Sequence, residues 1–347
     1  MRILITGNMG YVGSYLVQHL RSALPSAKLI GYDIGYFSKY LTNAPFLPEY
    51  SIDLQYFADV RKISADILTQ NQIDAVIHLA AISNDPMGKA YETITGDVNY
   101  GASIRLARLA KETGVLNFIF ASSCSMYGAG DDSPRTEAAP LNPLTAYARS
   151  KVNTEKALSE IAGPDLNVTC LRFATACGMS DRLRLDLVLN DFVAGAVASR
   201  NITILSDGTP WRPLINVKDM ARAIEWALFR NTDEPYIAVN VGSDEWNYQV
   251  RQLAEAVADL IPGVSVSINK NAEPDKRSYR VDFSLFKTLA PDHQPRYDLT
   301  RTIQELEEGL KAMHFNDPDF RNSNYMRLKV LNSFRESNFL TPSLEWT

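Results

Sequence analysis

The feature that most constrains the fold is an apolar run, Arg2–Thr6, that ends directly in the turn Gly7-x-x-Gly10-x-x-Gly13. Apolar residues at helical spacing follow over residues 15–24. Strand, glycine turn and helix in this order predict the first unit of a doubly wound α/β sheet that binds a dinucleotide at the turn. Gly7 would permit the tight turn, Gly10 would let the backbone approach a pyrophosphate, and Gly13 would allow close packing of the helix.

A second predicted strand, residues 28–32, ends at Asp33. An acid at this distance from the glycine turn is placed to hydrogen-bond an adenosine ribose. The carboxylate would repel a 2′-phosphate, and no arginine follows closely, so NAD is favoured and NADP stays possible. The alternative is an ordinary turn residue after a strand. A third apolar strand, residues 75–81, ends in small residues that leave room for the cofactor, and His78 within it is predicted to be a core residue.

A tyrosine and a lysine lie four residues apart in Ala146-Tyr147-Ala148-Arg149-Ser150-Lys151, on a predicted helix. This spacing places both side chains on one face. An ammonium near a phenol favours the phenolate, so Tyr147 could exchange a proton near neutral pH. A surface helix would show the same spacing. The catalytic interpretation is favoured because the strand 118–121 runs into the serine-rich segment 122–128, which supplies a hydroxyl at a strand end.

Length and composition agree with a large globular chain. The 347 residues suit an α/β domain with a second lobe, and the net charge of −5 argues against nucleic acid or an anionic membrane as the main partner. Three cysteines without a Cys-x-x-Cys pair argue against a disulfide framework or a zinc site, and no metal is expected. No apolar run reaches the ~20 residues of a membrane span, and a strand at Met1 leaves no room for a signal peptide. We expect a cytoplasmic protein.

The regular alternation of strands and helices weakens after the strand 168–173. We therefore expect an NAD-binding domain over residues 1–173, joined by parts of 174–240, and a substrate lobe with the C-terminal tail over 174–347. Arg212, in a turn at 208–213, is a candidate diphosphate ligand because a guanidinium matches phosphate oxygens. The cationic segment 274–280, which includes Arg280, would meet a phosphate or form a solvated loop. The tail is expected to hold a short basic helix at 322–331.

Taken together, these motifs resemble the extended short-chain dehydrogenase/reductase family, in particular its nucleotide-sugar epimerases, dehydratases and ketoreductases. The resemblance spans Gly7 to about Gly309 and implies a Rossmann sheet with a smaller α/β C-terminal lobe. It implies the catalytic residues Ser123, Tyr147 and Lys151. The implied cofactor ligands are Gly7, Gly10, Tyr11, Val12, Gly13, Asp33, Asp59, Val60, Leu79, Ala80, Ala81, Asn99, Ser122, Tyr147 and Lys151. The implied substrate ligands are Ser83, Asn84, Ser123, Ser125, Thr175, Asn190, Arg212 and Arg280.

Three departures from the family pattern bear on the reaction. The family's 4,6-dehydratases carry Asp-Glu after the catalytic Thr, whereas Cys124 and Ser125 follow Ser123 here, so dehydration is disfavoured. Enzymes of the family that deprotonate a carbon beside a ketone carry a cysteine at the place of Ser125. Cys124 is therefore expected to be a packing residue. Thr175 stands where the family usually has an asparagine that contacts the sugar nucleotide.

The resemblance implies an NAD-dependent nucleotide-sugar epimerase that transiently oxidises a sugar hydroxyl to a ketone. The same residues would serve an NAD(P)H-dependent reductase of a nucleotide-linked 4-keto-6-deoxy sugar. A non-catalytic NAD-sensing Rossmann protein is a further alternative, although such proteins typically lose the tyrosine or the lysine. In the family, helices corresponding to 96–113 and 146–161 commonly form a homodimer, which we expect here.

Overall fold

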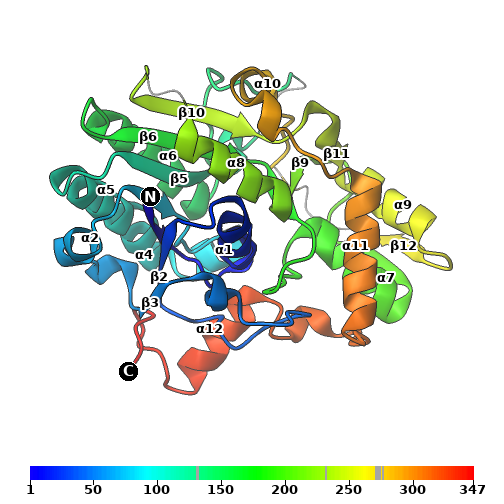
Figure 1. Ribbon diagram of the computed structural model, residues 1–347. Helices are drawn as coiled ribbons and strands as arrows, with labels where there is room; N and C mark the ends of the chain where they lie inside the picture. The colour runs from blue at the N-terminus through cyan, green and yellow to red at the C-terminus, as the bar shows by residue number, and fades with distance from the viewer. Residues whose placement is uncertain (130–132, 231–232, 270–274, 276) are drawn as a thin grey trace.

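The structure is a computed structural model that describes residues 1–129, 133–230, 233–269, 275 and 277–347. Its centre is a seven-stranded sheet of order β10-β6-β5-β4-β1-β2-β3 (Figure 1). The strands are β1 (Arg2–Thr6), β2 (Lys28–Asp33), β3 (Leu54–Phe57), β4 (Ala75–His78), β5 (Asn117–Ser123), β6 (Asn167–Phe173) and β10 (Tyr236–Val241). Neighbouring strands pair in parallel. The predicted doubly wound α/β fold is confirmed, and its strand order reverses between β1 and β4, where such sheets bind ligands.

Helices cover both faces of the sheet because side chains alternate between the faces along each strand. Ile3 and Ile5 of β1 pack on the side of α1 (Tyr11–Ala23), α8 (Val217–Phe229) and α10 (Ser284–Leu289). Leu4, between them, packs on the side of α2 (Ala65–Asn71), α5 (Ser103–Glu112) and α6 (Ala146–Ile161). A sheet buried on both faces explains the continuous apolar strands of the sequence.

A second core lies beside the sheet, to the right in Figure 1. It contains a three-stranded sheet of β7 (Thr175–Cys177), β9 (Trp211–Asn216) and β11 (Asn247–Gln249), and a two-stranded sheet of β8 (Asn201–Ile204) and β12 (Ser265–Ile268). The helices α7 (Val188–Ser199), α9 (Val250–Leu260) and α11 (Leu299–Ala312) pack around its apolar residues. This part of the chain faces the carboxyl ends of the large sheet's strands across the cavity described below.

The C-terminal segment forms a further apolar cluster with α3 (Asp85–Ala90) and α4 (Glu92–Gly96). Val330 and Leu331 of α12 (Arg327–Glu336) are fully buried there. The last residues then run back to the ends of β2 and β3, so that the C-terminus lies near β3 in Figure 1. The tail is thus a packed element of the fold.

Several elements differ from the expectation at their boundaries. The predicted helix 96–113 contains a π-helical segment, Asp97–Ala102, before α5 begins. The tail helix lies at 327–336 instead of 322–331, and the predicted turn at 208–213 already enters β9 at Trp211. β10 is not predicted from the sequence. Pro274 and Lys276 of the cationic segment lie outside the described residues. No described helix combines the length and apolar character that crossing a membrane requires.

Candidate active site

A cavity of about 820 Å³ lies where the parallel strands of the large sheet end. The glycine turn after β1, Asp33 at the end of β2, the segment 79–81 after β4 and Ser123 at the end of β5 all line it. Residues 184–188 and Arg212, from the second part of the chain, line it from the other side. The carboxyl ends of parallel strands meet at one edge, so residues far apart in sequence converge here.

The glycine turn is packed too tightly for any side chain at two of its three positions. Gly7 has a φ of 74°, and a Cβ atom there would lie 2.6 Å from the Ala80 nitrogen. A Cβ atom on Gly13 would lie 2.4 Å from the Gly7 oxygen. Helix α1 begins after Gly10 without a side-chain cap, so its first amide groups are free to bind an anion. The turn therefore has the geometry that the sequence predicts for binding a diphosphate.

Asp33 stands at the end of β2, beside this turn. Its carboxylate accepts hydrogen bonds from the Met9 amide at 3.1 Å and from the Gly35 amide at 2.7 Å. Burial raises the pKa of Asp33, and the two amide hydrogen bonds act in the opposite direction. Asp59 lines the cavity next to it, but its carboxylate is paired with the Arg61 guanidinium at 2.5 Å. Asp33 is thus the acid with accepting capacity left for a ribose.

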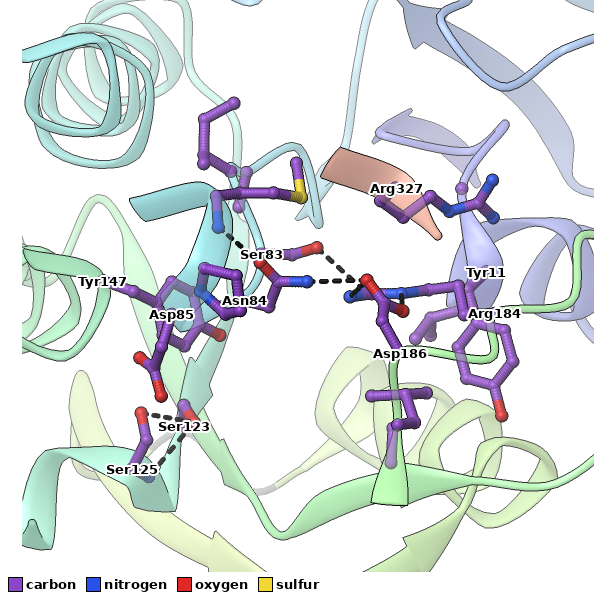
Figure 2. Close-up of a pocket in the computed structure, with 18 of the residues that line it drawn as sticks. Tyr11, Ser83, Asn84, Asp85, Ser123, Ser125, Tyr147, Arg184, Asp186 and Arg327 are labelled. Atoms are coloured by element: carbon purple, nitrogen blue, oxygen red, sulfur yellow. Dashed lines mark hydrogen bonds and ion pairs between the residues drawn. The ribbon is translucent and has the colours of Figure 1, made fainter. Parts of the chain in front are cut away.

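The three predicted catalytic residues meet at the opposite end of the cavity. Ser123 ends β5, and Tyr147 lies in the first turn of α6, whose N-terminus is capped by the Thr145 hydroxyl. Lys151 lies one turn further along α6, with its Nζ 5.6 Å from the centre of the Tyr147 ring. The Ser123 and Ser125 hydroxyls are 3.0 Å apart, and Figure 2 shows both on the same side of the cavity as Tyr147.

Burial dominates the titration of this pair. It raises the pKa of Tyr147 to about 12, against the lowering effect of the Ser123 hydroxyl. It lowers the pKa of Lys151 to about 8, against the raising effect of Glu155. The Lys151 ammonium donates to the Ala121 carbonyl at 2.6 Å instead of to the phenol. The expected lowering of the tyrosine pKa by the lysine is therefore absent from this arrangement, and a phenolate needs further positive charge in the cavity.

A buried network of hydrogen bonds and ion pairs lies beneath Ser123, Tyr147 and Lys151, on the protein side of the cavity wall. Glu155 accepts the Ser122 hydroxyl at 2.5 Å and pairs with Arg172 at 2.7 Å. His78 is enclosed between the Thr6 and Ser103 hydroxyls, at 2.6 and 2.8 Å, and burial lowers its pKa to about 3. The expectation that His78 is a satisfied core residue is confirmed.

One wall of the cavity carries an ion pair that no sequence motif predicts. Arg184 pairs with Asp186 at 2.8 Å and donates to the Ser83 hydroxyl at 2.9 Å. The Asn84 amide donates to Asp186 at 2.6 Å (Figure 2). Arg184 and Asp186 lie in the loop before α7, more than a hundred residues from Ser83 and Asn84, so no local sequence pattern predicts these contacts. Arg327, from α12, also lines the cavity near this pair.

Arginines also line the outer end of the cavity. Arg212 pairs with Asp275 at 2.7 Å and lines the cavity, as does Arg277, which contacts both Asp275 and Asp85. Arg280 lies elsewhere: its guanidinium stacks on the Trp211 ring at 5.2 Å, beside a separate shallow depression. Within the cationic segment, Arg277 thus occupies the place expected for Arg280.

Most of the expected site residues line the cavity. The cofactor ligands that do so are Gly7, Gly10, Tyr11, Val12, Gly13, Asp33, Asp59, Val60, Leu79, Ala80, Ala81, Ser122, Tyr147 and Lys151. The substrate ligands that do so are Ser83, Asn84, Ser123, Ser125, Thr175 and Arg212.

Two further expected ligands, besides Arg280, lie behind the cavity wall. The Asn99 amide pairs with the backbone of Ile82 and donates to the Ser150 hydroxyl. The Asn190 amide accepts from the Gly178 nitrogen and donates to the Tyr11 hydroxyl and the Arg184 carbonyl. Because their amide groups are buried and hydrogen-bonded to protein, the structure gives Asn99 and Asn190 a supporting place in the wall instead of the direct contacts expected.

Comparison with known proteins gives a consistent result. A sequence model of the NAD dependent epimerase/dehydratase family matches residues 3–242. A UDP-glucose 4-epimerase of Corynebacterium glutamicum is 27% identical over 280 residues, which are 75% of this chain and 80% of that protein. The solved UDP-glucose 4-epimerase of Thermotoga maritima with UDP-glucose has a TM-score of 0.78 at 22% identity, covering 90% of this chain and 99% of that one. The solved NAD dependent NDP-hexosamine 5,6-dehydratase TunA has a TM-score of 0.77 at 22% identity, covering 92% and 99%.

Proposed function

The chain belongs to the NAD dependent epimerase/dehydratase family, and we propose that within it the protein is a nucleotide-sugar epimerase. In this reaction a ring hydroxyl is oxidised transiently to a ketone and then reduced from the other face. The observation that carries the proposal is one cavity that holds a dinucleotide cradle at one end and Ser123, Tyr147 and Lys151 at the other.

The residues of the cavity fit NAD, which is the cofactor of this family. The uncapped N-terminus of α1 provides amide groups for the diphosphate, and Asp33 provides a carboxylate for the adenosine ribose. NAD supplies the hydride acceptor and donor when it is bound. Lys151 lies within reach of a ribose between these groups and Tyr147, as the resemblance to the family implies.

Tyr147 is the proton-transfer group of the proposal. Its hydroxyl would take the proton of the sugar hydroxyl, and the Ser123 hydroxyl would hydrogen-bond the same sugar oxygen as its charge changes. With a pKa of about 12, the phenol is neutral at pH 7 in the structure. The Lys151 ammonium and the charge of an oxidised cofactor would both favour the phenolate, so proton abstraction is coupled to cofactor binding.

The acids of the cavity argue against dehydration, which needs a carboxyl group free to exchange protons. Among the described residues, six carboxylates line it and five of them are paired with arginines: Asp59 with Arg61, Asp85 and Asp275 with Arg277, Asp186 with Arg184, and Asp191 with Arg321. The sixth, Asp33, lies at the cradle end. Cys124 follows Ser123 but is fully buried and donates to the Arg172 carbonyl. Elimination of water would thus lack a suitable acid.

The substrate would lie between the catalytic residues and the second part of the chain. Arg212 and Arg277 are two of the cations that line the cavity here, and they would bind its diphosphate. Leu187, Val188 and Phe192 offer an apolar surface for the nucleotide base beyond them. A nucleotide-sugar substrate is also what the relatives' names, UDP-glucose 4-epimerases, suggest.

Cofactor retention tests the proposal against its alternative. The protein is purified without added cofactor and denatured, and the released dinucleotide is identified by mass spectrometry. Near-stoichiometric NAD, together with interconversion of UDP-glucose and UDP-galactose or another isomer pair, is the expected result. An empty site that takes up NADH or NADPH and reduces a nucleotide-linked 4-keto-6-deoxy sugar would overturn epimerisation in favour of the reductase.

A further inference from the structure

Arg327, the first residue of α12, lines the cavity and carries a buried hydrogen-bond donor that has no partner among the described residues. Its side chain is 2% exposed, Nη2 donates to the Arg182 carbonyl at 2.8 Å, and the guanidinium stacks over the Phe37 ring at 4.1 Å. Nη1 is buried, and no atom in the described part of the chain accepts its hydrogen bond. A buried guanidinium keeps all its donors and its charge, so an unpartnered one is unfavourable unless an anion binds to it.

The charges around Arg327 do not supply that anion. Burial lowers the pKa of Arg327 to about 9, and the nearby Arg184 and Arg182 act in the same direction. Asp186 and Asp33 act against this lowering, but Asp186 is already paired with Arg184, and Asp33 makes no hydrogen bond with Arg327. Arg182 is likewise paired with Glu49 at 2.8 Å, so the neighbouring charges are matched, and Nη1 of Arg327 is left without an acceptor among the described residues.

The position of Arg327 along the cavity indicates which anion belongs there. The charge of Asp33, at the adenosine end, raises the pKa of Arg327, and the charge of Arg184 lowers it. The charge of Arg184 in turn lowers the pKa of Tyr11 in α1 and that of Tyr147 at the catalytic end. Arg327 lines the same cavity as the glycine turn and Tyr147, and in a dinucleotide bound there a diphosphate joins the two nucleosides. Figure 2 shows it on the side of the cavity near Tyr11 and Arg184, away from Ser123 and Tyr147.

The residues after α12 contact the backbone that flanks the adenosine end. The Trp346 indole donates to the Ile34 carbonyl at 2.7 Å, and the Tyr36 hydroxyl donates to the Leu344 carbonyl. Arg61, which holds Asp59, donates to the Ser343 carbonyl at 2.9 Å. The tail therefore bridges the loops after β2 and β3, which form that end of the cavity (Figure 1).

We propose that Arg327 binds the diphosphate of NAD from the side opposite the N-terminus of α1, and that residues 327–347 form a cover that opens before the cofactor leaves. The inference rests on the assignment of NAD but on neither the sugar nor the direction of the reaction. This C-terminal cover lies outside residues 3–242, which the family model matches. A cover of this kind keeps the dinucleotide in place between turnovers, as an epimerase requires.

The test compares NAD binding by the purified chain and its variants, measured as affinity by calorimetry and as release rate by dilution into a dinucleotide trap. Arg327→Met removes the charge at similar length, and Arg327→Lys restores a cation. Lys329→Met is the matched control, because Lys329 is exposed on the same helix. Trp346→Ala loosens the tail at a residue that is 45% exposed, so this variant is expected to fold, and it tests the cover without changing Arg327.

A charge-assisted hydrogen bond corresponds to an affinity loss of about ten- to a hundredfold for Arg327→Met, with partial recovery in Arg327→Lys. ADP-ribose, which keeps the diphosphate, should lose affinity by the same factor. Without cofactor, Arg327→Met should melt no lower than the wild type, because a buried charge is removed. Trp346→Ala should release NAD several-fold faster, and Lys329→Met should match the wild type.

Two outcomes would overturn the proposal. One is unchanged NAD affinity with weakened UDP binding in Arg327→Met, which would place the substrate's diphosphate at Arg327. The other is an unchanged release rate in Trp346→Ala, which would show that the tail does not control exit. A wild type that binds no dinucleotide would instead contradict the proposed function, so the two failures are distinguishable.

Discussion

Replacing Lys151 by methionine should abolish turnover and yet make the cofactor-free protein more stable at pH 7. The Lys151 side chain is 3% exposed, and burial lowers its pKa from 10.5 to about 8. One pKa unit corresponds to about 1.4 kcal/mol, so holding the ammonium charged at pH 7 destabilises the folded state by about 3 kcal/mol. Loss of the hydrogen bond to the Ala121 carbonyl offsets about 1–2 kcal/mol of the gain. Glu155 stays satisfied because it remains paired with Arg172.

The pH dependence has a defined sign. Between about pH 8 and 10.5 the unfolded wild type binds a proton at Lys151 that the folded wild type has released, so the stability of the wild type rises with pH through this window. Methionine does not titrate. The variant should therefore be more stable by about 1–2 kcal/mol at pH 7, and this advantage should disappear or reverse by pH 10.

Urea unfolding of cofactor-free protein, followed by tryptophan fluorescence at pH 7 and pH 10, measures both values. Lys156→Met is the matched control, because Lys156 is exposed on the same helix and should show no pH-dependent difference. Groups common to wild type and variant cancel in the comparison. A stability difference for Lys151→Met that is the same at both pH values would refute the reasoning, since it would mean that the buried ammonium is not destabilised by its surroundings.

Three further predictions follow from the site and the fold. Tyr147→Phe should lower kcat by about 10²–10⁴-fold while NAD stays bound, as mass spectrometry of the denatured variant would show; retained turnover would mean that another group transfers the proton. Gly13→Ala should abolish cofactor retention, because its Cβ would lie 2.4 Å from the Gly7 oxygen. Gly96→Ala is the control, since no atom lies within 4 Å of its Cβ. This variant should keep the cofactor and be more stable by about 0.5–1 kcal/mol in thermal denaturation. The exposed sides of α5 and α6 carry the cations Arg108 and Lys156 and the acids Glu112 and Glu160, so ion pairs would contribute to the expected homodimer. Light scattering in high salt should then show partial dissociation, and a fully active monomer in low salt would contradict the homodimer.

The cofactor end of the site was predictable because its determinants are local. The positive φ of Gly7 and the close approach of Gly13 to the turn belong to one strand–turn–helix unit, and such units carry a recognisable spacing. The four-residue spacing of Tyr147 and Lys151 likewise follows from helical periodicity alone. The parallel sheet follows from the alternation of apolar strands with helices. The exception is β10, which was not predicted because it is a short strand that follows the start of the second part of the chain.

The sequence by itself thus determined the fold class, and it predicted the residues proposed for the cofactor and for catalysis. Tertiary structure decided which other polar groups face the cavity: it brings in Arg184 and Arg327 from distant segments, and it keeps the Asn190 amide within the wall. It also decided the titration of the catalytic pair, since burial raises the pKa of Tyr147 and lowers that of Lys151. The physical reason is that dihedral preferences and periodicity act over a few residues, whereas desolvation and charge pairing depend on distances that exist only after the chain has folded.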